Sequence, residues 1–211
     1  MSKRNKKIKL NSGMTYVELI VVLSIFSVLS SIVLFNYSAF QARVDIKNLA
    51  NDIALKIVEA QKAAIGGMVP LKTITAPDWK PAFGIYFNTT TFGSNKSFIY
   101  FADTDQNNFD SDTSFCTSSG SGNECISKID ITKGNYISSI IVYNPNLATP
   151  TVPVTDLSLT FKRPNSGVTM YSTDQGGLLS GISYAEITIS SPQNIASKIR
   201  IYTSGRIQVN I

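Results

Sequence analysis

The feature that most constrains the fold is a long N-terminal stretch without glycine or proline. It runs from Met14 to Ile65, and Gly66 and Gly67 follow it. Glycine and proline are the residues that most disfavour a helix interior, and glycine often ends a helix. The sequence therefore predicts one helix over residues 14–66, which at 1.5 Å per residue is roughly 78 Å long.

The first part of this helix is almost entirely apolar. Residues 17–35 contain one charged residue, Glu18. A bilayer core of about 30 Å needs roughly 20 helical residues, so we predict a transmembrane segment at about 17–35. Cations without an accompanying acid precede it, which favours a cytoplasmic N-terminus and an extracytoplasmic remainder. These cations are Lys3, Arg4, Lys6, Lys7 and Lys9.

The second part of the helix is amphipathic. Its small and apolar residues recur at the i, i+3, i+4, i+7 spacing, while its charged residues fall mostly elsewhere. We expect the resulting stripe to pack against a globular domain. The stripe contains Ile46, Leu49, Ala50, Ile53, Ile57, Ala60, Gln61 and Ala64.

Composition argues against several classes of function. The net charge of +5 arises in the first 13 residues, and beyond them the basic residues equal the acidic ones at 14 each. We therefore expect no general nucleic-acid surface, and we interpret Lys198, Arg200 and Arg206 as a solvated face.

The chain has no histidine, which removes the usual general base and the commonest metal ligand. We therefore expect no enzyme activity.

The residues around Gly13 resemble a known processing signal. The segment G-M-T-Y-V-E-L-I-V-V-L after a Lys-rich leader is similar to the class III leader of type IV prepilins and type II secretion pseudopilins. In that family a membrane aspartyl peptidase cuts after the glycine and methylates the new amino terminus. The resemblance implies a leader at residues 1–13, cleavage at Gly13 and methylation of Met14. Met14 stands where the family usually has phenylalanine, and Tyr16 where leucine is commoner.

Glu18 is the fifth residue of the implied mature chain. A carboxylate within the apolar part of a membrane helix costs about 2.5–3.5 kcal/mol on insertion scales, although a position near the headgroups would lower this cost. Cleavage would create a cationic amine on Met14. Pairing of Glu18 with the Met14 amine of a neighbouring subunit would relieve both unpaired charges in a medium of low dielectric constant. We therefore interpret Glu18 as an assembly residue.

Beyond Gly67 the apolar residues alternate with a period of two, as in half-buried antiparallel strands. The predicted fold is α+β: the long helix, then an antiparallel β-rich head over 67–211, like a type IV pilin. We expect turns at Pro164–Gly167 and at Ser204-Gly205. The predicted strands are Phe83–Phe87, Ser97–Ala102, Ser138–Tyr143, Leu157–Phe161, Val168–Tyr171, Tyr184–Ile189, Ile199–Tyr202 and Arg206–Val209.

The head also resembles particular members of the family. The C-terminal segment IASKIRIYTSGRIQVNI, and its spacing from AFGIYF and SFIYFADTD, are similar to pseudopilin H and minor pilins. The resemblance implies a structural subunit of a type IV pilus or type II secretion pseudopilus. Its expected partners are prepilin peptidase, sister subunits, the inner-membrane assembly machinery and, before assembly, membrane lipid. The resemblance does not determine which of these two machines the subunit serves. It also does not determine whether the chain is a minor or a major subunit.

Two other functions are compatible with the leader region. A signal-anchored protein could carry an extracytoplasmic binding domain and never polymerise. An exported enzyme is a third interpretation, against which the absence of histidine and of a paired-carboxylate motif argue. Cleavage after Gly13 separates the first two interpretations.

The segment ADTDQNNFDSDTS offers oxygen ligands at alternate positions, as the start of a calcium loop does. The sequence requires no cofactor, but calcium could bind to this segment. Its ligands would be Asp103, Asp105, Asn107, the Phe109 carbonyl, Asp110 and Asp112. Asn108 stands where such loops have glycine, and Ser114 stands where they have a bidentate glutamate. An Asx-rich turn between two strands is the alternative.

The two cysteines of the chain, Cys116 and Cys125, enclose the segment TSSGSGNE. A pair of this kind in an exported domain is typical of a disulfide. The alternative is two free thiols in a reducing compartment.

Overall fold

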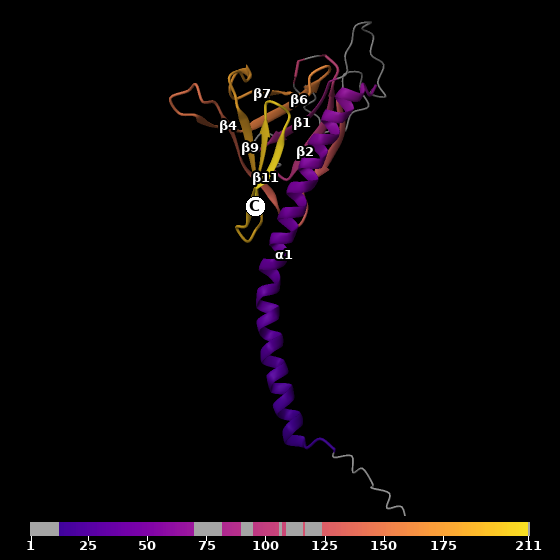
Figure 1. The fold of residues 1–211 in the computed structure, drawn as a ribbon, viewed down its shortest axis with the longest axis vertical. Coiled ribbons are helices and arrows are strands. Elements are labelled where there is room, and N and C mark those ends of the chain that lie inside the picture. The colour runs from indigo at the N-terminus through magenta and orange to yellow at the C-terminus, as the bar shows by residue number, and fades with distance from the viewer. Residues whose placement is uncertain are drawn as a thin grey trace, which may run out of the picture. The chain divides into compact units, whose positions relative to one another are not determined.

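The computed structural model describes residues 13–69, 82–89, 95–105, 107–108, 116 and 124–210. The fold is α+β, as predicted: helix α1 (Tyr16–Gly66) is followed by antiparallel strands in two sheets (Figure 1). The chain divides into two compact units, residues 1–41 and residues 42–211. The second unit holds the C-terminal part of α1 together with both sheets.

Helix α1 ends where the two glycines predict. The amide of Met68 donates to the carbonyl of Ala63 at 3.0 Å, and the amide of Gly67 donates to Ala64 at 3.2 Å. Gly67 has a φ of 65°, a left-handed conformation that glycine adopts without steric cost. This pair of hydrogen bonds is a Schellman motif, which satisfies carbonyls that the helix end would otherwise leave unpaired.

The first sheet has the strand order β3-β2-β1-β6-β7-β8, and every neighbouring pair is antiparallel. Its central strands are nearly all buried. In chain order the strands are β1 (Ala82–Asn88), β2 (Ser97–Asp103), β3 (Cys125–Asp130), β6 (Asp156–Lys162), β7 (Val168–Ser172) and β8 (Gly177–Leu178).

The second sheet has the order β11-β10-β9-β4-β5 and is also antiparallel throughout. Apolar side chains of its strands face the core, and polar or aromatic ones alternate with them on the outer face. The strands are β4 (Tyr136–Tyr143), β5 (Thr151–Val154), β9 (Tyr184–Ser190), β10 (Ala196–Tyr202) and β11 (Ile207–Asn210).

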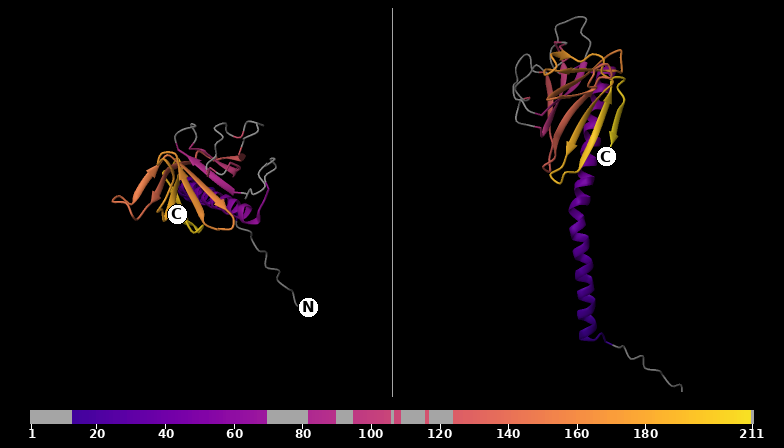
Figure 2. Two further views of the ribbon diagram at one scale, coloured as in Figure 1. Left: turned by 90° about the horizontal axis from the view of Figure 1, so that it is seen from above. Right: turned by 90° about the vertical axis from the view of Figure 1, so that its left-hand side faces the viewer.

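One hydrophobic core joins the C-terminal part of α1 to both sheets (Figures 1 and 2). Ile46, Ile53 and Ile57 are fully buried, which confirms the predicted stripe. Gln61 on the same helix donates its side-chain amide to the carbonyl of Ser166 at 2.7 Å. Ser166 lies in the predicted turn between β6 and β7, so polar contacts as well as packing hold this part of the helix.

Candidate functional site

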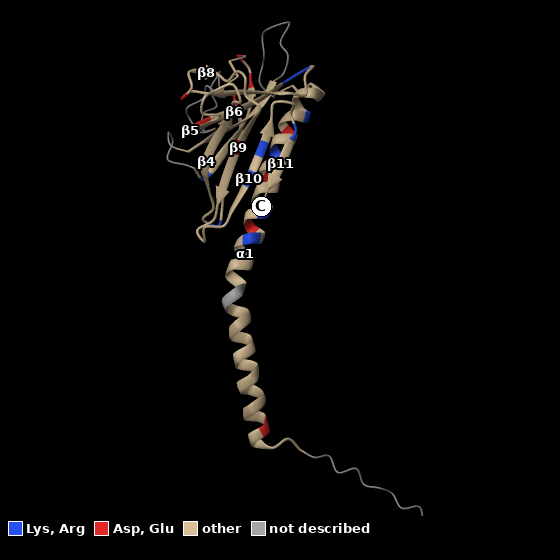
Figure 3. Ribbon diagram, turned by 60° about the vertical axis from the view of Figure 1, so that its left-hand side comes forward, with Lys and Arg blue, Asp and Glu red and all other residues tan. Residues whose placement is uncertain are grey.

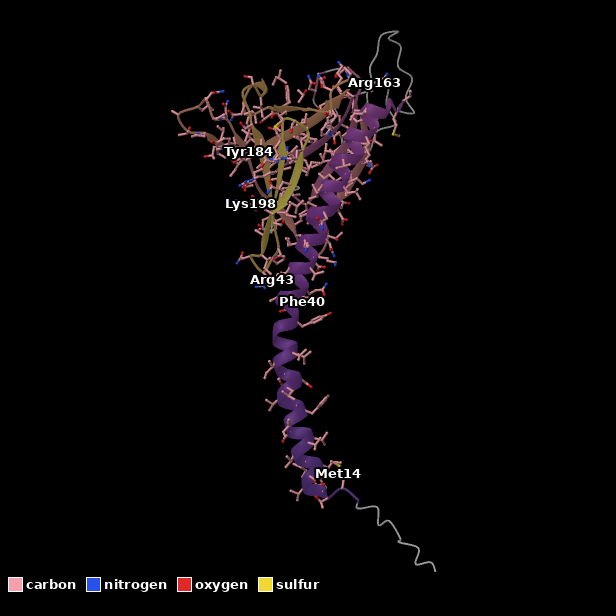
Figure 4. All side chains as sticks on the ribbon, in the orientation of Figure 1. Met14, Phe40, Arg43, Arg163, Tyr184 and Lys198 are labelled. Carbon is pink, nitrogen blue, oxygen red and sulfur yellow. A yellow bond between two sulfur atoms is a disulfide. The ribbon has the colours of Figure 1, made fainter. Side chains whose placement is uncertain are left out.

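Gly13 and Met14 lie just before the first turn of α1 and are exposed (Figure 4). A Cβ atom added to Gly13 would meet no atom within 4 Å. Among the described residues, nothing therefore covers the peptide bond between Gly13 and Met14. The bond also precedes the regular helix, so a protease could reach it without unwinding α1.

The first turn of α1 is capped by Thr15. Its side-chain oxygen accepts the amide hydrogen of Glu18 at 3.3 Å, and its carbonyl accepts the amide of Leu19 at 3.1 Å. The order Thr-x-x-Glu is that of a capping box. Glu18 also places a negative charge at the positive end of the helix dipole. This local role was not considered in the sequence analysis, although the Thr15-to-Glu18 spacing signals it.

The N-terminal part of α1 exposes an uninterrupted apolar surface. No charged residue lies between Glu18 and Arg43, and Figure 3 shows this stretch without blue or red. Leu19, the least exposed of its described large apolar side chains, is still 45% exposed. By length and composition, α1 can cross a membrane.

The predicted disulfide joins Cys116 to Cys125, with Cα atoms 5.2 Å apart. Cys125 is the first residue of β3, and the bond packs against a small apolar cluster on the first sheet. That cluster contains Tyr86, Ile99 and Phe101. The bond therefore holds Cys116 close to this cluster.

Three carboxylates meet at the end of β2. Single oxygen atoms of Asp103, Asp105 and Glu124 lie within 4.8 Å of one another. Asp103 and Glu124 are buried, at 1% and 2% exposure, whereas Asp105 is exposed. The donor atoms are all carboxylate oxygens, which hard cations such as calcium prefer.

The same carboxylates also hold the loop after β2. One oxygen of Glu124 accepts the amides of Thr104 at 2.6 Å and Asp105 at 3.2 Å, and the Thr104 hydroxyl at 3.0 Å. Asp105 accepts both the amide and the side-chain amide of Asn107, at 3.0 and 2.8 Å. Many of the carboxylate oxygens therefore already accept hydrogen bonds from the loop, as expected for the alternative, an Asx-rich turn.

The structure brings together part of the predicted calcium set and adds one residue to it. Asp103 and Asp105 meet, whereas Phe109, Asp110 and Asp112 lie outside the described residues. Glu124 was missed because it is distant in sequence. It reaches the end of β2 through the pairing of β2 with β3, where the amide of Ala102 donates to the carbonyl of Glu124 at 2.9 Å, and no local motif signals this contact.

Charged residues also meet on the outer face of the second sheet. Glu186 on β9 accepts Nζ of Lys198 at 2.7 Å and Nε of Arg200 at 2.6 Å. Burial alone raises the pKa of Glu186, but the two cations outweigh it and hold this pKa below the usual value of 4.5. In turn, the hydrogen bond and charge of Glu186 raise the pKa of Arg200 above its usual range. Lys198 and Arg200 are thus paired, not merely solvated as interpreted from sequence.

The pKa of Tyr100 on β2 is also perturbed. Burial, and then the charge of Glu59 on α1, raise the pKa of Tyr100 to about 12. Its ring stacks on Phe83 with centroids 6.2 Å apart. Its burial and this ring contact make Tyr100 a packing residue.

Comparisons with protein-family models, with curated proteins and with solved structures find no match to this chain.

Proposed function

We propose that this chain is a minor pilin or pseudopilin, a structural subunit of a type IV pilus or a type II secretion pseudopilus. Prepilin peptidase removes residues 1–13 and methylates Met14, and the mature chain joins sister subunits through α1. The observation that carries the proposal is the uncharged, exposed half of α1 directly after a lone glutamate. Before assembly this half spans the cytoplasmic membrane, with the N-terminus in the cytoplasm.

The free energy of hydration supports a packed or membrane-embedded state for this half of α1. Each Å² of apolar surface removed from water contributes about 25 cal/mol, and the large apolar side chains from Val17 to Leu34 are exposed in the single chain. A bilayer covers this surface before assembly. A bundle of like helices covers it afterwards, with the help of the inner-membrane assembly machinery.

Glu18 gives the bundle its register in this proposal. Its carboxylate has no partner among the described residues of its own chain. The amine that cleavage creates on Met14 supplies a partner of opposite charge from a neighbouring subunit. Where water is excluded, leaving both charges unpaired costs several kcal/mol. Subunits therefore dock where the two charges meet.

Intact mass and a matched pair of variants test the proposal. Protein from native membranes should lack residues 1–13 and carry one methyl group. Glu18→Ala should reduce incorporation into filaments by about tenfold or more, because 1.4 kcal/mol is already tenfold. Asp52→Ala removes an exposed carboxylate further along the same helix and should assemble normally. The Thr15 cap uses the backbone of residue 18, so Glu18→Ala leaves that bond in place.

Two outcomes would contradict this proposal. Met14 found still joined to Gly13 in mature protein would favour the signal-anchored binding protein that does not polymerise. Normal incorporation of Glu18→Ala would remove the pairing role. Equal loss in both variants would show a general defect of the helix instead.

Calcium stays a separate prediction. Asp103, Asp105 and Glu124 supply suitable oxygen atoms, and an extracytoplasmic location would supply the ion. Calorimetric titration of the full-length protein with calcium tests whether the ion binds. If no heat is observed, these residues serve only to stabilise an Asx-rich turn.

A further inference from the structure

Three tyrosines form a row across the outer face of the second sheet. Tyr143 on β4 lies opposite Tyr184 on β9, which lies opposite Tyr202 on β10. The rings of Tyr143 and Tyr184 stack with centroids 4.9 Å apart and planes at 8°. The ring of Tyr202 lies 5.6 Å from that of Tyr184, tilted by 52°. Cross-strand aromatic pairs of this kind are stabilising and rigid.

Two guanidinium groups extend this row. Cζ of Arg206 lies 3.9 Å from the centroid of the Tyr202 ring, and Cζ of Arg200 lies 5.2 Å from that of Tyr184. These are cation–π contacts, which fix a guanidinium against the ring and leave its N–H groups able to donate at its edge. We call Tyr143, Tyr184, Tyr202, Lys198, Arg200 and Arg206 the tyrosine–arginine face.

The tyrosine–arginine face has an excess of positive charge, although the basic and acidic residues of the whole chain beyond residue 13 are equal in number. Lys198, Arg200 and Arg206 provide three cations, and Glu186 is the one acidic residue in strands β4, β9, β10 and β11. Arg200 uses Nε for Glu186. Among the described residues, its terminal amino groups and the exposed guanidinium of Arg206 have no hydrogen-bond acceptor. Figure 3 shows the basic residues on β10, and Figure 4 labels Tyr184 and Lys198.

The geometry distinguishes between kinds of ligand. Nucleobases and sugars bind to aromatic residues by stacking on a free ring face. Here the faces of Tyr184 and Tyr202 are already occupied by neighbouring rings and guanidinium groups. The free groups are instead N–H donors ordered for bidentate contact with an oxyanion. Glu186 shows that cations of this face can bind a carboxylate, since one of its oxygens accepts from Lys198 and the other from Arg200.

We propose that the tyrosine–arginine face is a docking surface for a partner protein that presents clustered carboxylate side chains. Tyrosine and arginine are the residues that most often dominate protein interfaces. Side chains that are already ordered lose little conformational entropy on binding. The face involves neither Gly13 nor Glu18, so this proposal and the filament proposal can fail independently.

Binding of a synthetic oligoglutamate peptide tests the proposal. The full-length protein in a nonionic detergent is titrated against labelled peptide, and fluorescence anisotropy reports binding. An oligothymidylate of equal charge is the competing probe. Oligoglutamate should bind more tightly, and added salt should weaken its binding because the contacts are electrostatic. Arg200→Gln combined with Arg206→Gln should weaken binding by about tenfold, and Arg206→Gln alone by about threefold.

A charge-matched control isolates the face from net charge. Lys62→Gln combined with Lys96→Gln removes two exposed cations elsewhere and should change the affinity by less than about twofold. Arg206 is exposed and makes no bond to Glu186, so its single variant should fold normally. The proposal is overturned by an absence of oligoglutamate binding, by equal losses in both double variants, or by tighter binding of oligothymidylate. The last result would identify a nucleic-acid site instead.

Discussion

The two halves of helix α1 both carry apolar side chains but differ in what covers them. In residues 42–66 the apolar residues form a stripe, and Ile46, Ile53 and Ile57 on it are fully buried against the sheets. In residues 16–41 they surround the helix and stay exposed. One helix is therefore built for two environments. Where apolar side chains occupy one face, the chain covers them itself, and where they occupy every face, something outside the single chain must do so.

The largest predicted effect is a loss of stability on mutation of the buried stripe in residues 42–66 of α1. Ile53→Ala should lower the free energy of unfolding by about 2–5 kcal/mol, because a cavity replaces buried side-chain atoms. Leu55→Ala, two residues along, should change it by less than about 0.5 kcal/mol, since Leu55 is 64% exposed. Chemical unfolding followed by circular dichroism measures both. Similar losses in the two variants would mean that the stripe is not the packed face.

A second pair of variants compares the two halves of α1 at side chains of nearly equal exposure. Val28 is 62% exposed and Leu55 is 64% exposed. Val28→Lys should oppose membrane insertion by about 2.5–3.5 kcal/mol, because a charge would enter the bilayer core. Leu55→Lys should have almost no effect, because that site faces water. The fraction of protein recovered with membranes measures the difference, and equal recovery of both variants would contradict a membrane-spanning first half.

The smallest effect concerns two glutamates in contrasting surroundings. Glu186 is paired with Lys198 and Arg200, whereas Glu18 has no partner among the described residues of the single chain. Glu186→Gln should destabilise the protein by about 1–2 kcal/mol near neutral pH. Because the folded pKa of Glu186 lies below its usual 4.5, this contribution is complete above that value. It is lost as the pH falls through the lowered pKa.

The measurement for this prediction is the stability of wild type and Glu186→Gln as a function of pH. The difference between them should shrink as the pH falls below about 4.5. Near neutral pH, Glu18→Gln should lower the stability of the single chain by less, at most about 1 kcal/mol, because it removes only a charge at the positive end of the helix dipole. A difference for Glu186→Gln that does not vary with pH would assign its effect to packing and not to charge.

The sequence predicted every central strand and one edge strand, β11, but missed the other three edge strands. All eight predicted strands are present, with bounds that differ by a few residues at most. The missed strands, β3, β5 and β8, each lie at the edge of a sheet. An edge strand has one neighbour and little burial, so its alternation is weak, and Pro153 in β5 further disguises it. Proline is tolerated there because an edge amide needs no ladder partner.

The carboxylate cluster at the end of β2 and the tyrosine–arginine face could likewise be predicted only in part from the sequence. Sequence reasoning found Asp103 and Asp105 but not Glu124, which reaches them across the pairing of β2 with β3. It also interpreted Lys198, Arg200 and Arg206 as a solvated face. It did not predict the contacts of Arg200 with Glu186 and Tyr184, because these residues become neighbours only when β9 pairs with β10.

The sequence alone determined where α1 ends, which half of it is amphipathic, and that a β-rich domain follows. These features follow from local periodicity and from Gly66 and Gly67, which act within a few residues. Only the tertiary structure decided which carboxylates and which rings meet. Such contacts depend on strand order and register, which are set by burial of the whole domain and leave little trace in any short segment.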